Sequence, residues 1–156
     1  MQQRPEPSQC APSCGATSDS AGSEDYGVGV DSEVVERWRR RLPSLRRGAR
    51  LFTEREHEYC ERFADPAPVY AGSWCAKEAV FKAVSRFGTL TLDQIEIERL
   101  ATGYPLVHLP RSLAQIVRVR VSITHDTERA VAFAVAVAQS GSIRMEAVDA
   151  GREALG

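Results

Sequence analysis

GSWCAKEAVFKAV, residues 72–84, reads as a helix that is apolar on almost every side yet contains three charged residues. Ala76, Val80 and Ala83 recur at helical spacing and predict a buried helix running from Val69 to Phe87, with Gly88 placed to end it. The charged residues within it are Lys77, Glu78 and Lys82. A charge on a buried helix is costly unless it has a partner, so these side chains need an explanation.

A surface ion pair is the simplest explanation for two of them. Glu78 and Lys82 are four residues apart with the acid first, a spacing whose ion pairs stabilise a helix by about 0.3–0.5 kcal/mol. A helix this apolar leaves little surface for such a pair, however. The alternative is that the charges belong to a binding or catalytic site.

The composition excludes several broad classes of protein. The chain has 156 residues, a length that suits one domain, and 43% of them are hydrophobic, which is enough for a core. The net charge of −1 predicts no overall attraction to nucleic acid or to a membrane surface. No apolar run approaches the ~20 residues of a membrane helix, and the N-terminus lacks the apolar segment of a secretory signal. We therefore expect a cytoplasmic protein whose four cysteines are free thiols.

Two tails flank the predicted domain. Residues 1–25 are rich in Ser, Pro, Gly and acidic residues and have few large apolar side chains, a composition typical of disorder. Residues 140–156 form a weakly apolar C-terminal tail. The folded domain is therefore expected to span residues 26–139.

The order of the predicted elements indicates the fold class. A short strand at 26–31 is followed by helical patterns, and the second half of the domain consists of alternating apolar strands. Thr53 and Glu56 form a capping box that predicts a helix start. We expect an α+β domain, an antiparallel sheet with a long central helix and shorter helices packed on one side. The strand at 130–138 has valines and a phenylalanine on one face and alanines on the other, so both faces are expected to be buried.

A second unusual acid suggests what the charges on the helix do. Asp31 ends the first predicted strand just before a helix, where it could be a helix cap or a cation ligand. Asp31 and Glu78 together would supply two carboxylates, which suits Mg²⁺ because this ion completes its ligands with water and substrate phosphate. Lys82, one turn from Glu78, could contact the same phosphate. These residues form a candidate metal–phosphate site, and His125, at a strand end, is a candidate for either a structural or a site residue.

Three motifs in this order resemble those of a known enzyme family. GVGVD (27–31), WCAKEAVFK (74–82) and SITHD (122–126) resemble signature segments of the holo-acyl-carrier-protein synthases, the single-unit class of the 4′-phosphopantetheinyl transferase superfamily. The family pattern is Gly-small apolar-Asp, then aromatic-x-x-Lys-Glu-x-x-x-Lys, then Ser-Ile-Ser/Thr-His. The resemblance covers residues 26–139 and extends to the segments LFTERE, LDQIEI and GYP.

The resemblance implies a reaction and a set of roles. The chain would transfer the phosphopantetheine arm of coenzyme A to a serine of an apo acyl carrier protein of fatty-acid or polyketide synthesis. The other product would be 3′,5′-ADP. Asp31 and Glu78 would hold Mg²⁺ and would form the catalytic group with Lys82, while Lys77, Lys82 and His125 would contact coenzyme A. The general base stays open among Glu78, a metal-bound water and Lys82.

The chain departs from the family pattern in three places. Ser73 stands where many members have an arginine, Tyr104 stands where a basic residue is usual, and the loop at 88–90 is shortened. These differences affect the residues expected around the nucleotide of the coenzyme.

An arginine-rich segment, residues 36–50, supports a different interpretation. It could bind the phosphates of RNA or DNA, which would make the chain a non-enzymatic nucleic-acid-binding module. Aromatic side chains for base stacking are nearly absent from it, however. In the resembled family this helix docks the acidic carrier protein, which implies that Arg37, Arg40 and Arg41 are docking residues. A P-loop nucleotide hydrolase is excluded because the chain has no Gly-x-x-x-x-Gly-Lys-Ser/Thr motif.

The resemblance also implies an assembly. Single-unit members form homotrimers whose active sites are shared between neighbouring chains. The strand at 130–138 suits such an interface, since one face could pack on the long helix and the other on a neighbour. We assign its alanine face to the contact with the neighbour.

Overall fold

The structure, a computed structural model, describes residues 26–45 and 51–139. Its elements are, in chain order, β1 (Tyr26–Val34), α1 (Val35–Leu45), α2 (Glu54–Cys60), α3 (Ala67–Val84), η1 (Leu92–Gln94), β2 (Glu96–Arg99), β3 (Pro105–His108), α4 (Arg111–Ala114), β4 (Val117–His125) and β5 (Arg129–Ala138). The predicted disordered extension, the C-terminal tail and residues 46–50 of the arginine-rich segment lie outside the described residues.

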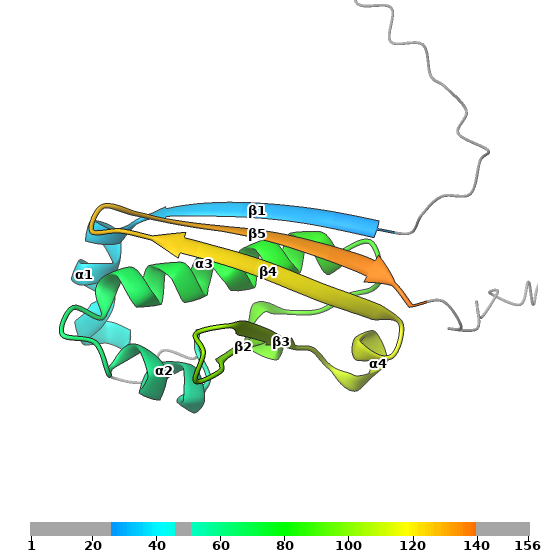
Figure 1. Cartoon of the computed structure of the whole chain (residues 1–156), viewed down its shortest axis with the longest axis horizontal. Coiled ribbons are helices and arrows are strands. Elements are labelled where there is room, and N and C mark those ends of the chain that lie inside the picture. The colour runs from blue at the N-terminus through cyan, green and yellow to red at the C-terminus, as the bar shows by residue number, and fades with distance from the viewer. Residues whose placement is uncertain (1–25, 46–50, 140–156) are drawn as a thin grey trace, which may run out of the picture.

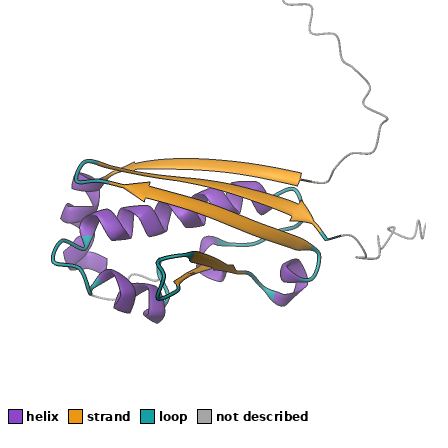
Figure 2. Ribbon diagram, in the orientation of Figure 1, coloured by secondary structure: helices purple, strands orange, loops and turns teal. Residues whose placement is uncertain are grey.

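Three antiparallel strands form the main sheet, in the order β1-β5-β4. α3 lies beneath this sheet and above the separate β2–β3 hairpin, and the helices lie on one side of the sheet (Figure 1; Figure 2). The predicted α+β class with a long central helix is confirmed. The separation of the hairpin from the main sheet was not predicted. Pro110 and the short helix α4 interrupt the chain between β3 and β4, so the chain turns before the long strands begin.

The main sheet packs closely on α3 because small residues line the contact. The alanines of β5 at 130, 132, 134 and 136 are buried, as are the alanines of α3 at 76, 79 and 83. On β1, Gly27 and Gly29 face the helix so closely that a Cβ at either position would overlap a backbone carbonyl, that of Ala83 or Ala79. The glycines of the GVGVD motif therefore allow β1 to approach α3.

Replacing Gly29 with alanine should lower the free energy of unfolding by about 2–3 kcal/mol, because β1 or α3 must shift to admit the methyl group. Urea denaturation followed by circular dichroism measures the change. Ser32→Ala, an exposed position on the same strand, is the control and should change stability by less than about 0.5 kcal/mol. Equal stability of Gly29→Ala and the control would show that the contact is looser than described.

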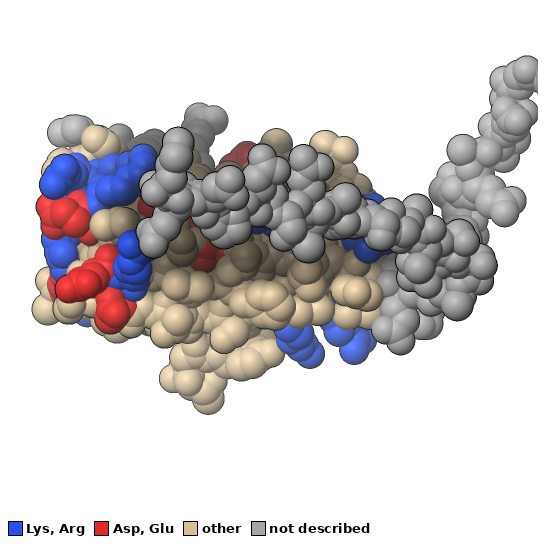
Figure 3. All heavy atoms as spheres, turned by 90° about the horizontal axis from the view of Figure 1, so that it is seen from above, with Lys and Arg blue, Asp and Glu red and all other residues tan. Residues whose placement is uncertain are grey.

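The opposite face of the main sheet carries large apolar side chains at the surface. Between 47% and 58% of each remains exposed in Tyr26, Val28, Val30, Phe133 and Val137. Where this side is uncovered in Figure 3, it is largely uncharged, with most charged residues at one end and a few basic side chains along one edge. The prediction that both faces of the strand at 130–138 are buried is therefore wrong for a single chain. The alanine face packs on α3, and the valine face is the one left open.

Several element boundaries differ from those predicted. β1 continues to Val34 because all nine of its residues pair with β5, so α1 begins only at Val35. α3 begins at Ala67, earlier than predicted, because Pro66 and Pro68 fit the first turn. It ends at Val84, and the Phe87 amide donates to the Val84 carbonyl in a tighter turn before Gly88. No helix among the described residues is both long and apolar enough to cross a membrane.

The cysteines that the structure describes are free, as predicted. Cys60 and Cys75 are buried, and burial is the main cause that raises the pKa of each thiol to about 12. Both thiols are therefore neutral at physiological pH and poor nucleophiles.

Candidate active site

Asp31 lies inside β1, where it pairs with Ala132 of β5. The predicted position at a strand end is therefore wrong, and Asp31 is not a helix cap. It belongs to the strand face that includes Gly27 and Gly29, so its carboxylate points toward α3 and is 19% exposed. This placement brings the acid of the first motif to the helix of the second.

Glu78 lies on the part of α3 that faces Asp31. Burial is the main cause that raises the pKa of the Glu78 carboxyl, and the charge of Asp31 is the next largest cause. Glu33 raises this pKa further, whereas Lys82 lowers it. The carboxylates of Asp31 and Glu33 beside Glu78 therefore concentrate negative charge at this site, which a cation would relieve.

Lys82 pairs with Asp31 rather than with Glu78. Its ammonium donates to Asp31 Oδ1 and to the backbone carbonyl of Val30, both at 2.9 Å. Among the ion pairs of the described residues, the Glu78–Lys82 pair suggested by sequence spacing is absent. The three residues predicted as a metal–phosphate site are nevertheless brought together by the packing of β1 on α3.

The oxygens at this site suit a hard divalent cation. No group of three or more His, Cys, Asp or Glu residues in the described parts of the chain is arranged to hold a metal. The two carboxylates of Asp31 and Glu78 match the usual protein contribution to a Mg²⁺ site, in which water and substrate phosphate supply the other ligands. The residues therefore fit Mg²⁺ and do not fit a closed structural zinc site.

Glu33 is a third carboxylate near this pair, and sequence reasoning missed it. Its side chain is 15% exposed, and its Oε2 is buried without a hydrogen-bond partner, 3.7 Å from Arg37 Nη1. It lies two residues after Asp31 on the same face of β1. The i, i+2 spacing would have revealed it if the strand had been predicted to continue beyond Asp31.

Lys77 is fully buried in the core. Its ammonium contacts Glu56 Oε2 at 2.8 Å and the carbonyl of Ile95 at 2.6 Å, and it lies over the ring of Phe52. Glu56 in turn accepts from the amides of Thr53 and Ile97. Lys77 thus links α3 to α2 and to the segment leading into β2, and its full burial does not support the predicted contact with coenzyme A.

His125 lies on the other edge strand of the main sheet. It is the last residue of β4, and its ring lies against Gly72 of α3. This burial lowers the pKa of His125, and the neighbouring guanidinium of Arg99 lowers it further. Arg99 itself has a buried Nε without a partner and lies over the ring of Tyr59. His125 is therefore not grouped with Asp31 and Lys82 within one chain.

Two of the residues that depart from the expected pattern, Ser73 and Tyr104, lie outside the carboxylate site. Ser73 is buried, and its hydroxyl lies 3.9 Å from the Cys60 sulfur. Tyr104 is exposed in the turn between β2 and β3, where Gly103 has a φ of +82°. Neither residue replaces the basic side chain that the family places there.

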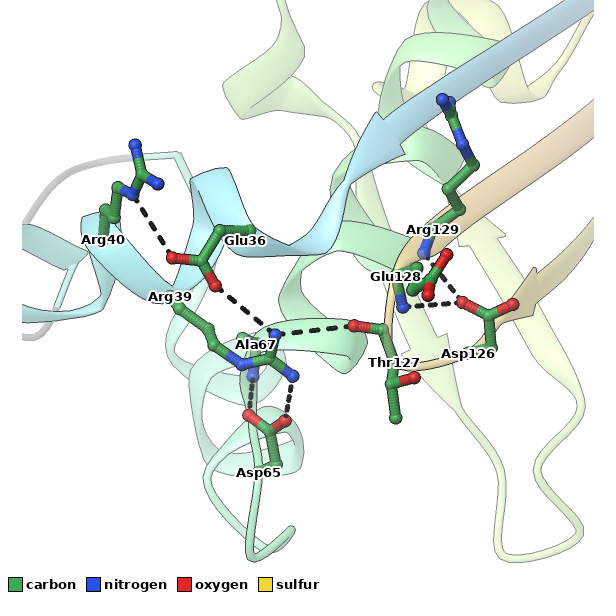
Figure 4. Close-up of polar contacts among 9 residues, drawn as sticks. All are labelled: Glu36, Arg39, Arg40, Asp65, Ala67, Asp126, Thr127, Glu128 and Arg129. Carbon is green, nitrogen blue, oxygen red and sulfur yellow. Dashed lines mark hydrogen bonds and ion pairs between the residues drawn. The ribbon is translucent and has the colours of Figure 1, made fainter.

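The described arginines of α1 divide into structural and exposed side chains. Arg39 is structural because it bonds Asp65 at 2.6 Å and the Thr127 carbonyl at 3.4 Å, tying α1 to two loops (Figure 4). Arg40 makes only a local contact with Glu36 on its own helix. The three predicted docking residues are exposed and share one face of α1 through their i, i+3, i+4 spacing: Arg37, Arg40 and Arg41.

Known proteins are similar to this chain in sequence and in fold. A family model for the 4′-phosphopantetheinyl transferase superfamily matches residues 27–137. A holo-[acyl-carrier-protein] synthase of Desulforudis audaxviator is 37% identical over 129 residues, covering 76% of this chain and 97% of the relative. A fatty acid synthase subunit alpha of Lachancea kluyveri is 38% identical over 125 residues, covering 74% of this chain but only 6% of that subunit.

A solved structure from the same family is similar to this chain in fold. The ACPS–CoA complex of Chronobacterium ammoniagenes is similar with a TM-score of 0.61 and 26% identity, over 74% of this chain and 99% of that one. The matched region includes all three motifs and the residues gathered around Asp31. The chain therefore belongs to the 4′-phosphopantetheinyl transferase superfamily.

Proposed function

We propose that the chain is a holo-acyl-carrier-protein synthase that uses Mg²⁺. It transfers the 4′-phosphopantetheine group of coenzyme A to a serine of an apo acyl carrier protein. The observation that carries this proposal is the grouping of Asp31, Glu78 and Lys82 between β1 and α3. The similarity to a holo-acyl-carrier-protein synthase over nearly its whole length, and to an ACPS–CoA complex, supports it.

The reaction is a phosphoryl transfer in which the side chains position and neutralise groups. The serine oxygen of the carrier attacks the phosphorus nearest the pantetheine arm, and the bond from this phosphorus to the 3′,5′-ADP oxygen breaks. The serine proton passes to a base, and 3′,5′-ADP leaves with the bonding electron pair. Mg²⁺ on Asp31 and Glu78 would neutralise charge on the pyrophosphate oxygens.

Lys82 and Glu78 have separate parts in this scheme. The Lys82 ammonium donates hydrogen bonds in the structure, so we assign it to a phosphate oxygen rather than to proton removal. We assign Glu78 to holding Mg²⁺ together with Asp31. Glu33 is placed to add a third carboxylate beside the pair.

The non-enzymatic nucleic-acid-binding alternative is contradicted by membership of a transferase family. Among the described arginines of α1, Arg39 is held by Glu36 and Asp65. The exposed arginines that remain fit an acidic carrier protein. A cytoplasmic location remains a prediction.

Carrier docking is tested by reversing charge on α1. Arg40→Glu should raise the KM for the acidic carrier protein about tenfold while leaving the KM for coenzyme A nearly unchanged, and Arg37→Glu should act in the same direction. Steady-state assays that vary each substrate separately measure both constants. Arg55→Glu on α2, also exposed, is the control and should leave both constants unchanged. An equal rise in both KM values for Arg40→Glu would argue against docking.

A homotrimer is the assembly that we propose, with the valine face of the main sheet as its interface. The half-exposed apolar residues of β1 and β5 on this face need a cover, which a neighbouring chain would supply. Charge placed there, as in Phe133→Lys, should reduce the mass in solution from three chains to one and reduce activity. Light scattering measures the mass, and Ser112→Lys on the exposed surface of α4 is the control. A fully active monomeric wild type would refute an active site shared between chains.

The activity itself is tested by product analysis. Incubation with coenzyme A, Mg²⁺ and apo carrier protein should release one 3′,5′-ADP for each carrier modified. Replacing coenzyme A with ATP should give no product, because the arm to be transferred is missing. Hydrolysis of ATP by the wild type would favour a different phosphotransferase.

A further inference from the structure

The ammonium of Lys82 already lies at the oxygens that a divalent cation would use. Its two acceptors, Asp31 Oδ1 and the Val30 carbonyl, come from consecutive residues of β1 and are both 2.9 Å from Nζ. Carboxylate and backbone carbonyl oxygens are the hard ligands that Mg²⁺ and Mn²⁺ prefer. The side chain therefore makes the contacts of a bound cation at this site.

Lys82 and a divalent cation cannot both occupy Asp31 Oδ1 and the Val30 carbonyl. Only 19% of the Asp31 side chain is exposed, and the ammonium is on one of its two oxygens. An ammonium and a divalent ion on one carboxylate would repel each other at short range, where water screens charges poorly. A divalent cation that takes these two oxygens therefore displaces the ammonium.

Lys82 is the one that can move. Its side chain is 45% exposed, unbranched and located in the last turn of α3, so the ammonium can rotate into solvent without displacing the helix. Asp31 is fixed by the pairing of β1 with β5, and Glu78 is held on the same helix without an ion pair to Lys82. The carboxylates therefore remain in place for a metal when the ammonium leaves.

We infer that Lys82 is a built-in competitor for the metal site, exchanging the oxygens of Asp31 and Val30 for the substrate's pyrophosphate when a divalent cation binds. This inference rests on the proposed function. The free chain should bind metal weakly, since binding must break the contacts of Lys82. Coenzyme A should strengthen metal binding because its pyrophosphate gives the displaced ammonium a new partner. By linkage, the metal should strengthen coenzyme A binding by the same factor.

The test measures Mn²⁺ binding directly, by electron paramagnetic resonance of the unbound ion at fixed ionic strength and without carrier protein. Lys82→Met should bind Mn²⁺ about three- to tenfold more tightly than the wild type, because the competing cation is gone. Arg86→Met, in the turn just after α3, removes the same charge from a side chain that bonds the Tyr26 carbonyl rather than Asp31, and is the control. It should bind Mn²⁺ like the wild type. Coenzyme A should tighten Mn²⁺ binding more in the wild type than in Lys82→Met.

The alternative outcomes are distinct. Equal or weaker Mn²⁺ binding by Lys82→Met would overturn the inference, as would an equal gain in Arg86→Met, which would show only a general effect of charge. If Lys82→Met unfolds, Lys82→Gln serves in its place, and Lys82→Arg, which keeps a cation, should not show the gain. The proposed function is tested separately, and it fails if the wild type transfers no phosphopantetheine. The Mn²⁺ measurement does not depend on that result, because it involves neither transfer nor a carrier protein.

Discussion

Lys77→Met is expected to lower the free energy of unfolding by about 3–5 kcal/mol, a large part of the stability of a small domain. Methionine keeps most of the apolar stem of lysine but removes the ammonium from a fully buried ion pair. The Glu56 carboxylate is then left in the core with only amide donors, and the Ile95 carbonyl loses its partner. Urea denaturation of the metal-free chain measures the loss.

A double-mutant cycle separates the ion pair from simple loss of packing. Glu56→Gln and the double variant complete the cycle, and the double variant should be more stable than the sum of the two single losses predicts. Glu54→Gln, an exposed first-turn acid of α2, is the control and should have little effect. A loss below about 1 kcal/mol for Lys77→Met would mean that the buried contact is not formed as described.

Asp31→Asn and Glu78→Gln are each expected to lower kcat/KM for phosphopantetheine transfer on the order of 10²–10³-fold. Both substitutions keep the shape of the side chain and remove the charge that would hold Mg²⁺. Glu58→Gln, on the exposed surface of α2, should retain full activity. Turnover near that of the wild type in either site variant at saturating Mg²⁺ would contradict the assignment.

The free energy of unfolding of Glu78→Gln provides a second test of the assignment, because replacing a residue with a structural role would lower it. Folding raises the pKa of Glu78, mainly through burial, so the neutral carboxyl is favoured in the folded state. Its stabilising contribution is present below the ordinary carboxyl pKa and is lost as the pH rises through the raised value. At pH 7 without metal, Glu78→Gln should therefore be slightly more stable than the wild type, by about 0.5 kcal/mol. An inactive variant that is also more stable is typical of a residue kept for function.

Local patterns in the sequence were sufficient for much of the fold. The capping box of Thr53 and Glu56 forms as predicted, since it depends on residues three apart. The alternation in β4 correctly predicts a buried face of valines, because side chains along a strand alternate between two faces. Alternation alone did not reveal which face of β5 meets the helix. That choice follows from the close approach of α3, which favours the alanine face over the valine face.

The site residues could be predicted where a charged residue interrupts the apolar pattern of a single helix or strand. Glu78 and Lys82 stand out because they interrupt an apolar helix, and Asp31 because it follows an apolar strand. Lys77 interrupts the same helix, yet its partner Glu56 is 21 residues away on another helix, and no local spacing indicates that pair. The Lys82–Asp31 contact likewise depends on packing between β1 and α3. Charges in a buried helix thus indicate that partners exist without telling a structural partner from a ligand.

The intact mass of an apo acyl carrier protein tests the central claim most directly. The carrier would be incubated with this chain, coenzyme A and Mg²⁺, and its mass measured before and after the reaction. We expect a gain of one phosphopantetheine group with the wild type and little or none with Asp31→Asn in the same time. An unchanged mass for the wild type, with carrier proteins that an established transferase modifies in the same buffer, would contradict the proposed function.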